Sequence, residues 1–158
     1  MIESPPRPRP AAESDSPAYL RLVRSSAWYD LAVTIGFATP WTYALLHGAA
    51  NAASGALGLS PLHEANPTQL LYANLMGSVV TVWALLRLVR PQRVHGLFDG
   101  AARLLFSAWF AYALAHGGPE LLWALLALEV PWGVAQLAPW CSRRFRRSRR
   151  TRPIAVPL

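Results

Sequence analysis

Four apolar segments, each about twenty residues long, most constrain what this chain can fold into. They cover approximately residues 27–46, 70–88, 97–115 and 120–140. A helix rises about 1.5 Å per residue, so each segment is long enough to cross a hydrocarbon layer roughly 30 Å thick. Apolar residues make up 53% of the 158 residues and charged residues only 15%, a balance unusual for a soluble domain. We therefore predict an all-α integral membrane four-helix bundle.

The third segment is the least apolar of the four, because Asp99 and Arg103 fall within its first two turns. Residues four apart lie on one face of a helix, so these two side chains can pair and ease each other's insertion. For this reason the segment is retained as a spanning helix.

The arginines predict the orientation. Four precede the first segment, four bracket the connection between the second and third, and seven follow the fourth, which accounts for all fifteen basic residues. With four spans, all of them fall on one side, and the positive-inside rule makes that side the cytoplasm. Arginine used without any lysine is typical of a GC-rich bacterial genome. We expect a multi-pass protein of the bacterial inner membrane with both termini cytoplasmic.

The chain divides into three regions. Residues 1–24 form a Pro- and Arg-rich lead-in that we expect to be disordered, residues 25–141 the membrane domain, and residues 142–158 a basic tail. A tail that directly follows a span is predicted to lie against anionic lipid, at about 1 kcal/mol per arginine, rather than to bind nucleic acid. The predicted lipid-binding residues are Arg143, Arg144, Arg146, Arg147, Arg149 and Arg150.

Residues 29–48 and 98–117 resemble each other. Their sequences, YDLAVTIGFATPWTYALLHG and FDGAARLLFSAWFAYALAHG, agree at eight of twenty positions, and the matches include Asp, Phe, Tyr and His. Both copies would run outward from the cytoplasm. The repeat predicts two tandem helical hairpins related by a pseudo-two-fold axis along the membrane normal.

Glu129 is the candidate binding residue that we single out, because a charge near the middle of a span costs several kcal/mol unless it is paired. It could hold a ligand or make an interhelical hydrogen bond. The candidate partners are Asn74, Ser78, Tyr43 and Tyr112, together with Thr39 and Ser107. A predicted ligand site consists of Glu129, Asn74, Ser78, Tyr43 and Tyr112.

Two further pairs come from the repeat. His47 and His116 end the first and third spans and could bind a metal or haem between them, or could simply cap helix ends before Gly48 and Gly117.

Asp30 and Asp99 begin the same spans, where a carboxylate meets the positive end of the helix dipole. With Arg103 they are predicted to form a structural ion cluster, about half a bilayer away from Glu129.

Cysteine chemistry is limited by the single Cys141, which excludes an intrachain disulfide and the paired cysteines of vitamin K epoxide reductase-type enzymes. The chain also contains no phosphate loop, no HExxH motif and no paired catalytic carboxylates.

In overall plan, residues 25–141 resemble the DoxX-like group of small bacterial four-helix membrane proteins, through their four spans and the stretches YANLMGS and FSAWFAYAL. Some members of that group accompany quinone-linked thiol or thiosulfate oxidation, and the resemblance implies a quinone- or haem-linked redox subunit as one alternative. Our leading expectation is a non-catalytic accessory subunit of a membrane complex, or a binder of a small lipophilic ligand, without a cofactor. An oligomeric small transporter is the third alternative.

Overall fold

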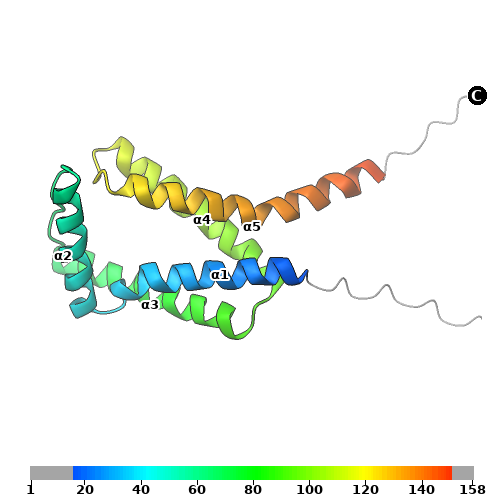
Figure 1. Cartoon of the computed structure of the whole chain (residues 1–158), viewed down its shortest axis with the longest axis horizontal. Coiled ribbons are helices and arrows are strands. Elements are labelled where there is room, and N and C mark those ends of the chain that lie inside the picture. Colours follow the sequence, from blue (N-terminus) through cyan, green and yellow to red (C-terminus); the bar gives the residue numbers. More distant parts are fainter. Residues whose placement is uncertain (1–15, 151–158) are drawn as a thin grey trace, which may run out of the picture.

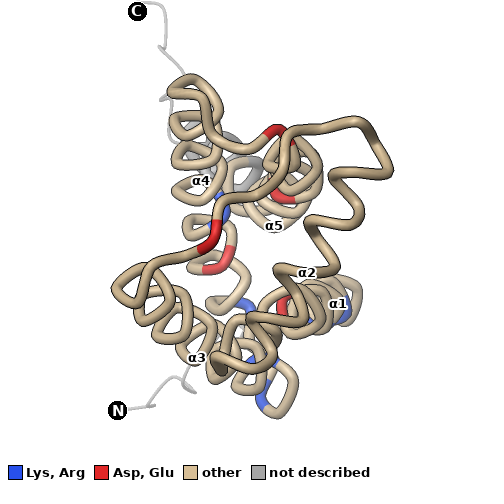
Figure 2. The backbone as a smooth tube through the Cα atoms, turned by 90° about the vertical axis from the view of Figure 1, so that its left-hand side faces the viewer, with Lys and Arg blue, Asp and Glu red and all other residues tan. Residues whose placement is uncertain are grey.

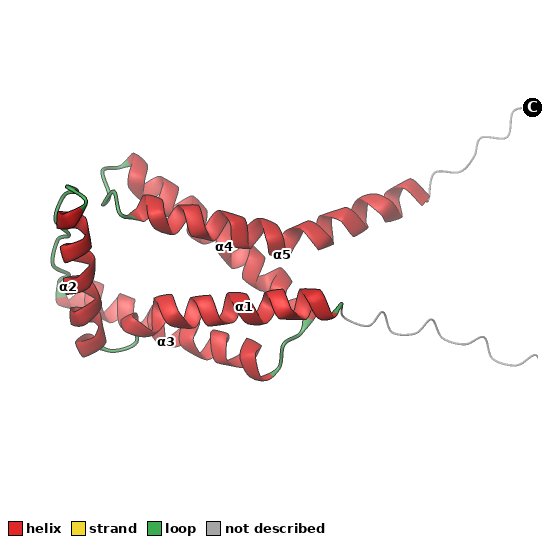
Figure 3. Cartoon of the chain, in the orientation of Figure 1, coloured by secondary structure: helices red, strands yellow, loops and turns green. Residues whose placement is uncertain are grey.

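The computed structural model describes residues 16–150, and within this range the chain consists of helices joined by short loops (Figures 1 and 3). The side chains of residues 142–150 and everything outside 16–150 are not described. No strand occurs in the described range, which confirms the all-helical prediction. The elements are α1 (Pro17–Thr34), the 3₁₀ turn η1 (Ile35–Phe37), α2 (Pro40–Ala56), α3 (Pro67–Val89), α4 (Arg93–Ala115) and α5 (Leu122–Arg150).

The first predicted span, residues 27–46, is not one helix. α1 ends at Thr34, and α2 starts anew at Pro40 after the 3₁₀ turn. The Thr39 hydroxyl accepts a hydrogen bond from the Thr42 backbone N–H at 3.2 Å, and Pro40 occupies the first helical position, where its missing N–H is not needed. α2 therefore runs across the end of α1 instead of continuing it (Figure 1).

The other three predicted spans correspond to α3, α4 and α5. α3 begins with a reciprocal capping box, in which the Asn66 and Gln69 side chains each accept the other's backbone N–H at 2.9 Å. α5 contains two prolines, Pro131 and Pro139, and Figure 1 shows that the helix bends partway along its length. Prolines inside a helix cause such bends.

The long helices pack as two pairs, α1 against α3 and α4 against α5, with α1 also touching α4 and α5. Two glycines allow close approach. A Cβ at Gly77 would lie 2.5 Å from the carbonyl carbon of Phe37, and one at Gly100 would lie 2.7 Å from Leu137 Cγ. Both distances are shorter than carbon atoms tolerate. Gly77 is therefore the point at which α3 meets the turn between α1 and α2.

Polar and apolar side chains are distributed in an unusual way. Among the described residues, the buried hydrophobic ones are Tyr19, Val23, Ala27 and Ala84, whereas twenty-five large hydrophobic side chains are exposed. Most of the tube in Figure 2 is uncharged.

Two described helices, Pro67–Val89 and Leu122–Cys141, are long and apolar enough to span a membrane. In the most apolar 18 residues of these two helices only 11% and 17% are buried, whereas the core helix of a soluble protein is mostly buried.

Candidate functional site

Five charged side chains from all four long helices meet inside the bundle. They are Asp30 on α1, Arg87 on α3, Asp99 and Arg103 on α4, and Glu129 on α5, and we call them the charge network. None of these side chains is more than 12% exposed. Buried charges of this kind persist only when they are paired and hydrogen-bonded.

Arg103 binds three carboxylates, one with each nitrogen of its guanidinium group. Nη2 lies 2.5 Å from Asp30 Oδ1, Nη1 lies 2.8 Å from Glu129 Oε2, and Nε lies 3.3 Å from Asp99 Oδ2. The structure therefore brings Asp30, Asp99 and Arg103 together, in the arrangement expected from the repeat and from the four-residue spacing of Asp99 and Arg103.

Arg87 is the second cation of the network, and sequence reasoning missed it. Its side chain is fully buried, forms ion pairs with Asp30 and with Asp99 (2.7 Å to Oδ2), and donates to Ser26 Oγ at 3.0 Å. The orientation prediction places Arg87 with the other arginines on the cytoplasmic side, and the structure shows that its guanidinium group, like that of Arg103, is held between helices.

Neutral donors complete the surroundings of Asp99. The Ser26 hydroxyl and the Gln136 amide donate to Oδ2 at 2.7 and 2.6 Å, and the Trp83 indole N–H donates to Oδ1 at 3.1 Å. Ser26 and Gln136 are themselves fully buried. Asp99 is thus the most completely hydrogen-bonded carboxylate of the network.

Glu129 has fewer partners than the two aspartates. Beyond Arg103, its hydrogen bond is with the Tyr29 hydroxyl, which donates to Oε1 at 3.3 Å. The predicted partners do not reach it, and the expected separation of half a bilayer between Glu129 and the Asp–Arg cluster is also wrong. α5 packs closely on α4, and this contact brings Glu129 directly to Arg103.

The helix-dipole explanation for the aspartates is wrong as well. No acidic residue occupies the first turn of α1 or α4. Asp30 lies in the last turns of α1, and Asp99 lies in the second turn of α4. Their stabilisation comes from the two guanidinium groups instead.

A cavity of about 500 Å³ opens beside the network, and we call it the bundle cavity. Asp30, Asp99, Arg103 and Glu129 border its polar part. Its remaining walls are mostly apolar and come from α1, η1, α3, α4 and α5: Tyr29, Val33, Thr34, Phe37, Met76, Val80, Phe106, Trp109, Phe110, Leu122 and Leu125. The repeat-related pairs Asp30 with Asp99, and Phe37 with Phe106, both line it.

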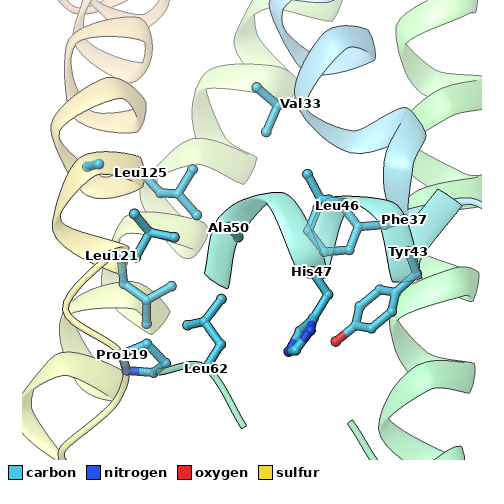
Figure 4. A pocket seen from close by; sticks show the side chains of 12 residues that line it. Val33, Phe37, Tyr43, Leu46, His47, Ala50, Leu62, Pro119, Leu121 and Leu125 are labelled. Carbon is cyan, nitrogen blue, oxygen red and sulfur yellow. The ribbon is translucent and has the colours of Figure 1, made fainter. Parts of the chain in front are cut away.

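A second, outer pocket of about 340 Å³ lies between α2 and the start of α5 (Figure 4). Leu46, His47 and Tyr43 of α2 face Pro119 and Leu121 across it. Four residues line both spaces: Val33, Phe37, Leu122 and Leu125. The outer pocket therefore adjoins the bundle cavity.

The other predicted ligand-site residues lie elsewhere. Tyr43 lines the outer pocket, and Ser78 and Tyr112 are exposed. Asn74 is half-buried, and its Oδ1 has no hydrogen-bond partner among the described residues. Of the five residues predicted to form one site, only Glu129 lines the bundle cavity. The predicted lipid-binding arginines of residues 143–150 have side chains outside the described part.

Each of the two histidines makes contacts near the end of its own predicted span. His47 lies within α2, stacks on Tyr43 and hydrogen-bonds the His63 carbonyl at 3.1 Å. His116 caps α4, stacks on Tyr112 and lies 2.8 Å from the Tyr112 carbonyl. His47 therefore does not end a helix, whereas His116 does. No group of three or more metal-ligating residues occurs in residues 16–150.

The fold and the site together define a small helical protein in which two helices could cross a membrane and charged side chains gather between the helices. Comparison with known protein families, with characterised proteins and with solved structures finds no match for this chain. The functional argument therefore depends on the network and the cavity alone.

Proposed function

We propose that this is a multi-pass membrane protein in which α1, α3, α4 and α5 cross the bilayer and both termini are cytoplasmic. The exposed apolar side chains of α3 and α5 support this, because a lipid environment is one in which they need no protein partner. The burial of Asp30, Arg87, Asp99, Arg103 and Glu129 supports it too, since intramembrane charges face a bundle interior and pair with one another.

Within this bundle we propose a non-catalytic function, the binding of a small lipophilic ligand. The observation that carries the proposal is the bundle cavity of about 500 Å³. Its walls are mostly apolar, but they include the charged groups of Glu129 and Arg103. Small-molecule sites are typically concave, roughly 300–1,000 Å³ in volume, and mostly apolar with a few polar groups that orient the ligand. An apolar tail would lie against Val80 and Leu125, with its polar end toward the network.

The proposal is tested with the protein in phosphatidylcholine nanodiscs and a decanol that carries a photoreactive diazirine. After irradiation, peptide mass spectrometry locates the labelled residues. We expect labelling at cavity residues such as Phe106 and Leu125, and we expect excess plain decanol to suppress it. Val82, which is 67% exposed on α3, is the control for labelling by reagent dissolved in the surrounding lipid. Excess decanol should not suppress labelling at this position.

Two neighbouring substitutions distinguish the cavity from the helix surface. Val80→Trp places an indole where the valine borders the cavity and should remove the saturable labelling. Val79→Trp changes a side chain that is 69% exposed on the same helix and should leave it unchanged. Saturable labelling that survives Val80→Trp, or its absence from the unmodified protein, would overturn the proposed function.

A further inference from the structure

We infer that the ligand of the bundle cavity has a cationic head group of the alkylammonium class, which lies against Glu129. This inference rests on the proposed function, because it specifies the chemistry of the molecule that the cavity takes. Three features of the site lead to it: the charge balance of the network, the position of the least-compensated carboxylate, and the aromatic side chains in the walls of the cavity.

The charge network contains more acid than base. Asp30, Asp99 and Glu129 are three carboxylates, whereas Arg87 and Arg103 are two guanidinium groups. With every group in its usual ionised form, one negative charge is in excess. An unbalanced charge between membrane helices is unfavourable, so the network favours the arrival of one positive charge.

The excess charge is concentrated at Glu129. Asp30 and Asp99 each contact both guanidinium groups, and Asp99 accepts three further hydrogen bonds from neutral donors. Of the two guanidinium groups Glu129 contacts that of Arg103, through Oε2, and within the described part of the chain its Oε1 has only the 3.3 Å contact with the Tyr29 hydroxyl. Oε1 is thus the carboxylate oxygen of the network with the weakest contact.

Glu129 lines the bundle cavity, so a ligand there can reach it. Arg103 also lines the cavity, but its three nitrogens are directed at Asp30, Asp99 and Glu129 Oε2, which offsets its repulsion of a cation.

The walls of the cavity include four aromatic rings, those of Tyr29, Phe106, Trp109 and Phe110, and the Tyr29 hydroxyl contacts the carboxylate itself. An ammonium group is attracted to the faces of such rings, most strongly where water is excluded.

The test titrates decyltrimethylammonium, decanol and decyl sulfate, each as a competitor of the photoreactive decanol, over the same range of mole fractions in the bilayer. The quantity measured is the mole fraction that halves the saturable labelling. We expect the ammonium compound to act at an about tenfold lower mole fraction than decanol. Decyl sulfate should act only at a higher mole fraction than decanol.

Variants of the carboxylate test its role. Glu129→Gln should reduce the preference for the ammonium compound to near equality with decanol, whereas Glu129→Asp, which keeps the charge, should retain a preference. Glu120→Gln removes an exposed carboxylate in the turn just before α5 and should change nothing. Far-ultraviolet circular dichroism shows whether each variant remains helical.

The failures of the two proposals are distinguishable. If decanol competes as well as decyltrimethylammonium in the unmodified protein, the cationic head group is overturned while the lipophilic site stands. A preference for the ammonium compound that Glu129→Gln leaves intact would overturn the assignment to Glu129. If none of the three compounds suppresses the labelling, the proposed function itself fails.

Discussion

Replacing Arg103 with methionine should destabilise the bundle more than any other single substitution in the charge network. Methionine keeps much of the side-chain length but removes the guanidinium nitrogens with which Arg103 pairs with Asp30, Asp99 and Glu129. Three buried carboxylates would then face Arg87 alone, so two negative charges would be in excess. Removing one partner of a buried ion pair costs about 3–5 kcal/mol, and we expect a loss in this range for Arg103→Met.

A second substitution separates the charge effect from lost packing. Glu129→Gln removes one carboxylate and leaves two acids with two guanidinium groups, so we expect it to be neutral or slightly stabilising. In the double variant Arg103→Met/Glu129→Gln, two acids face one base, and the excess is again one negative charge. The double variant should therefore recover part of the stability that Arg103→Met alone loses, with a coupling energy of about 0.5–3 kcal/mol.

The assay is reversible unfolding in mild detergent, followed by far-ultraviolet circular dichroism. Arg90→Met provides the matched control, because Arg90 is exposed at the end of α3 and a surface change costs about 0.5 kcal/mol or less. A loss for Arg103→Met no larger than that for Arg90→Met would refute the network as a stabilising element. A double variant as unstable as the sum of its parts would refute the charge-balance argument.

Two further substitutions test the packing of the bundle. Gly77→Val should cost about 1–3 kcal/mol of unfolding free energy, because its Cβ would collide with the Phe37 backbone, whereas Gly48→Ala, in open space, should be tolerated. Equal stability of both variants would contradict the α3–η1 contact. Tyr19→Phe removes a hydroxyl that donates to the Gln136 carbonyl at 2.8 Å and accepts from the Trp140 indole at 3.0 Å. It should cost about 1 kcal/mol and shift the fluorescence of Trp140, and an unchanged spectrum would contradict this contact.

The sequence predicts most helices because long apolar segments have few other options. The predicted ranges 70–88, 97–115 and 120–140 largely coincide with α3, α4 and α5. The break in the first segment was missed because hydropathy does not report it. The local signal was present, since Thr39 before Pro40 is a typical helix start.

The candidate site was predicted only in part. The pairing of Arg103 with Asp99 follows from their spacing, and the repeat indicated Asp30. Arg87 was missed because its position at the end of a span made it one more arginine near the headgroups, and Glu129 was given the wrong partners because its depth was judged from residue counting alone.

The spacing of polar residues along the sequence could have identified the side of each long helix that faces the bundle interior. Pairs of polar residues four or seven apart, which share a helix face, mark the inward side of each long helix: Ser26 and Asp30, Trp83 and Arg87, Asp99 and Arg103, Glu129 and Gln136.

The central claim is that the helices are surrounded by lipid, with their charges inside and their apolar side chains outside. Cysteine accessibility in intact cells tests it most directly, in a Cys141→Ser background with a membrane-impermeant maleimide. Ser60→Cys, in the exposed loop between α2 and α3, should react, whereas Val79→Cys should react only after solubilisation and unfolding, although Val79 is 69% exposed in the isolated chain. Rapid reaction of Val79→Cys in intact membranes would contradict the claim.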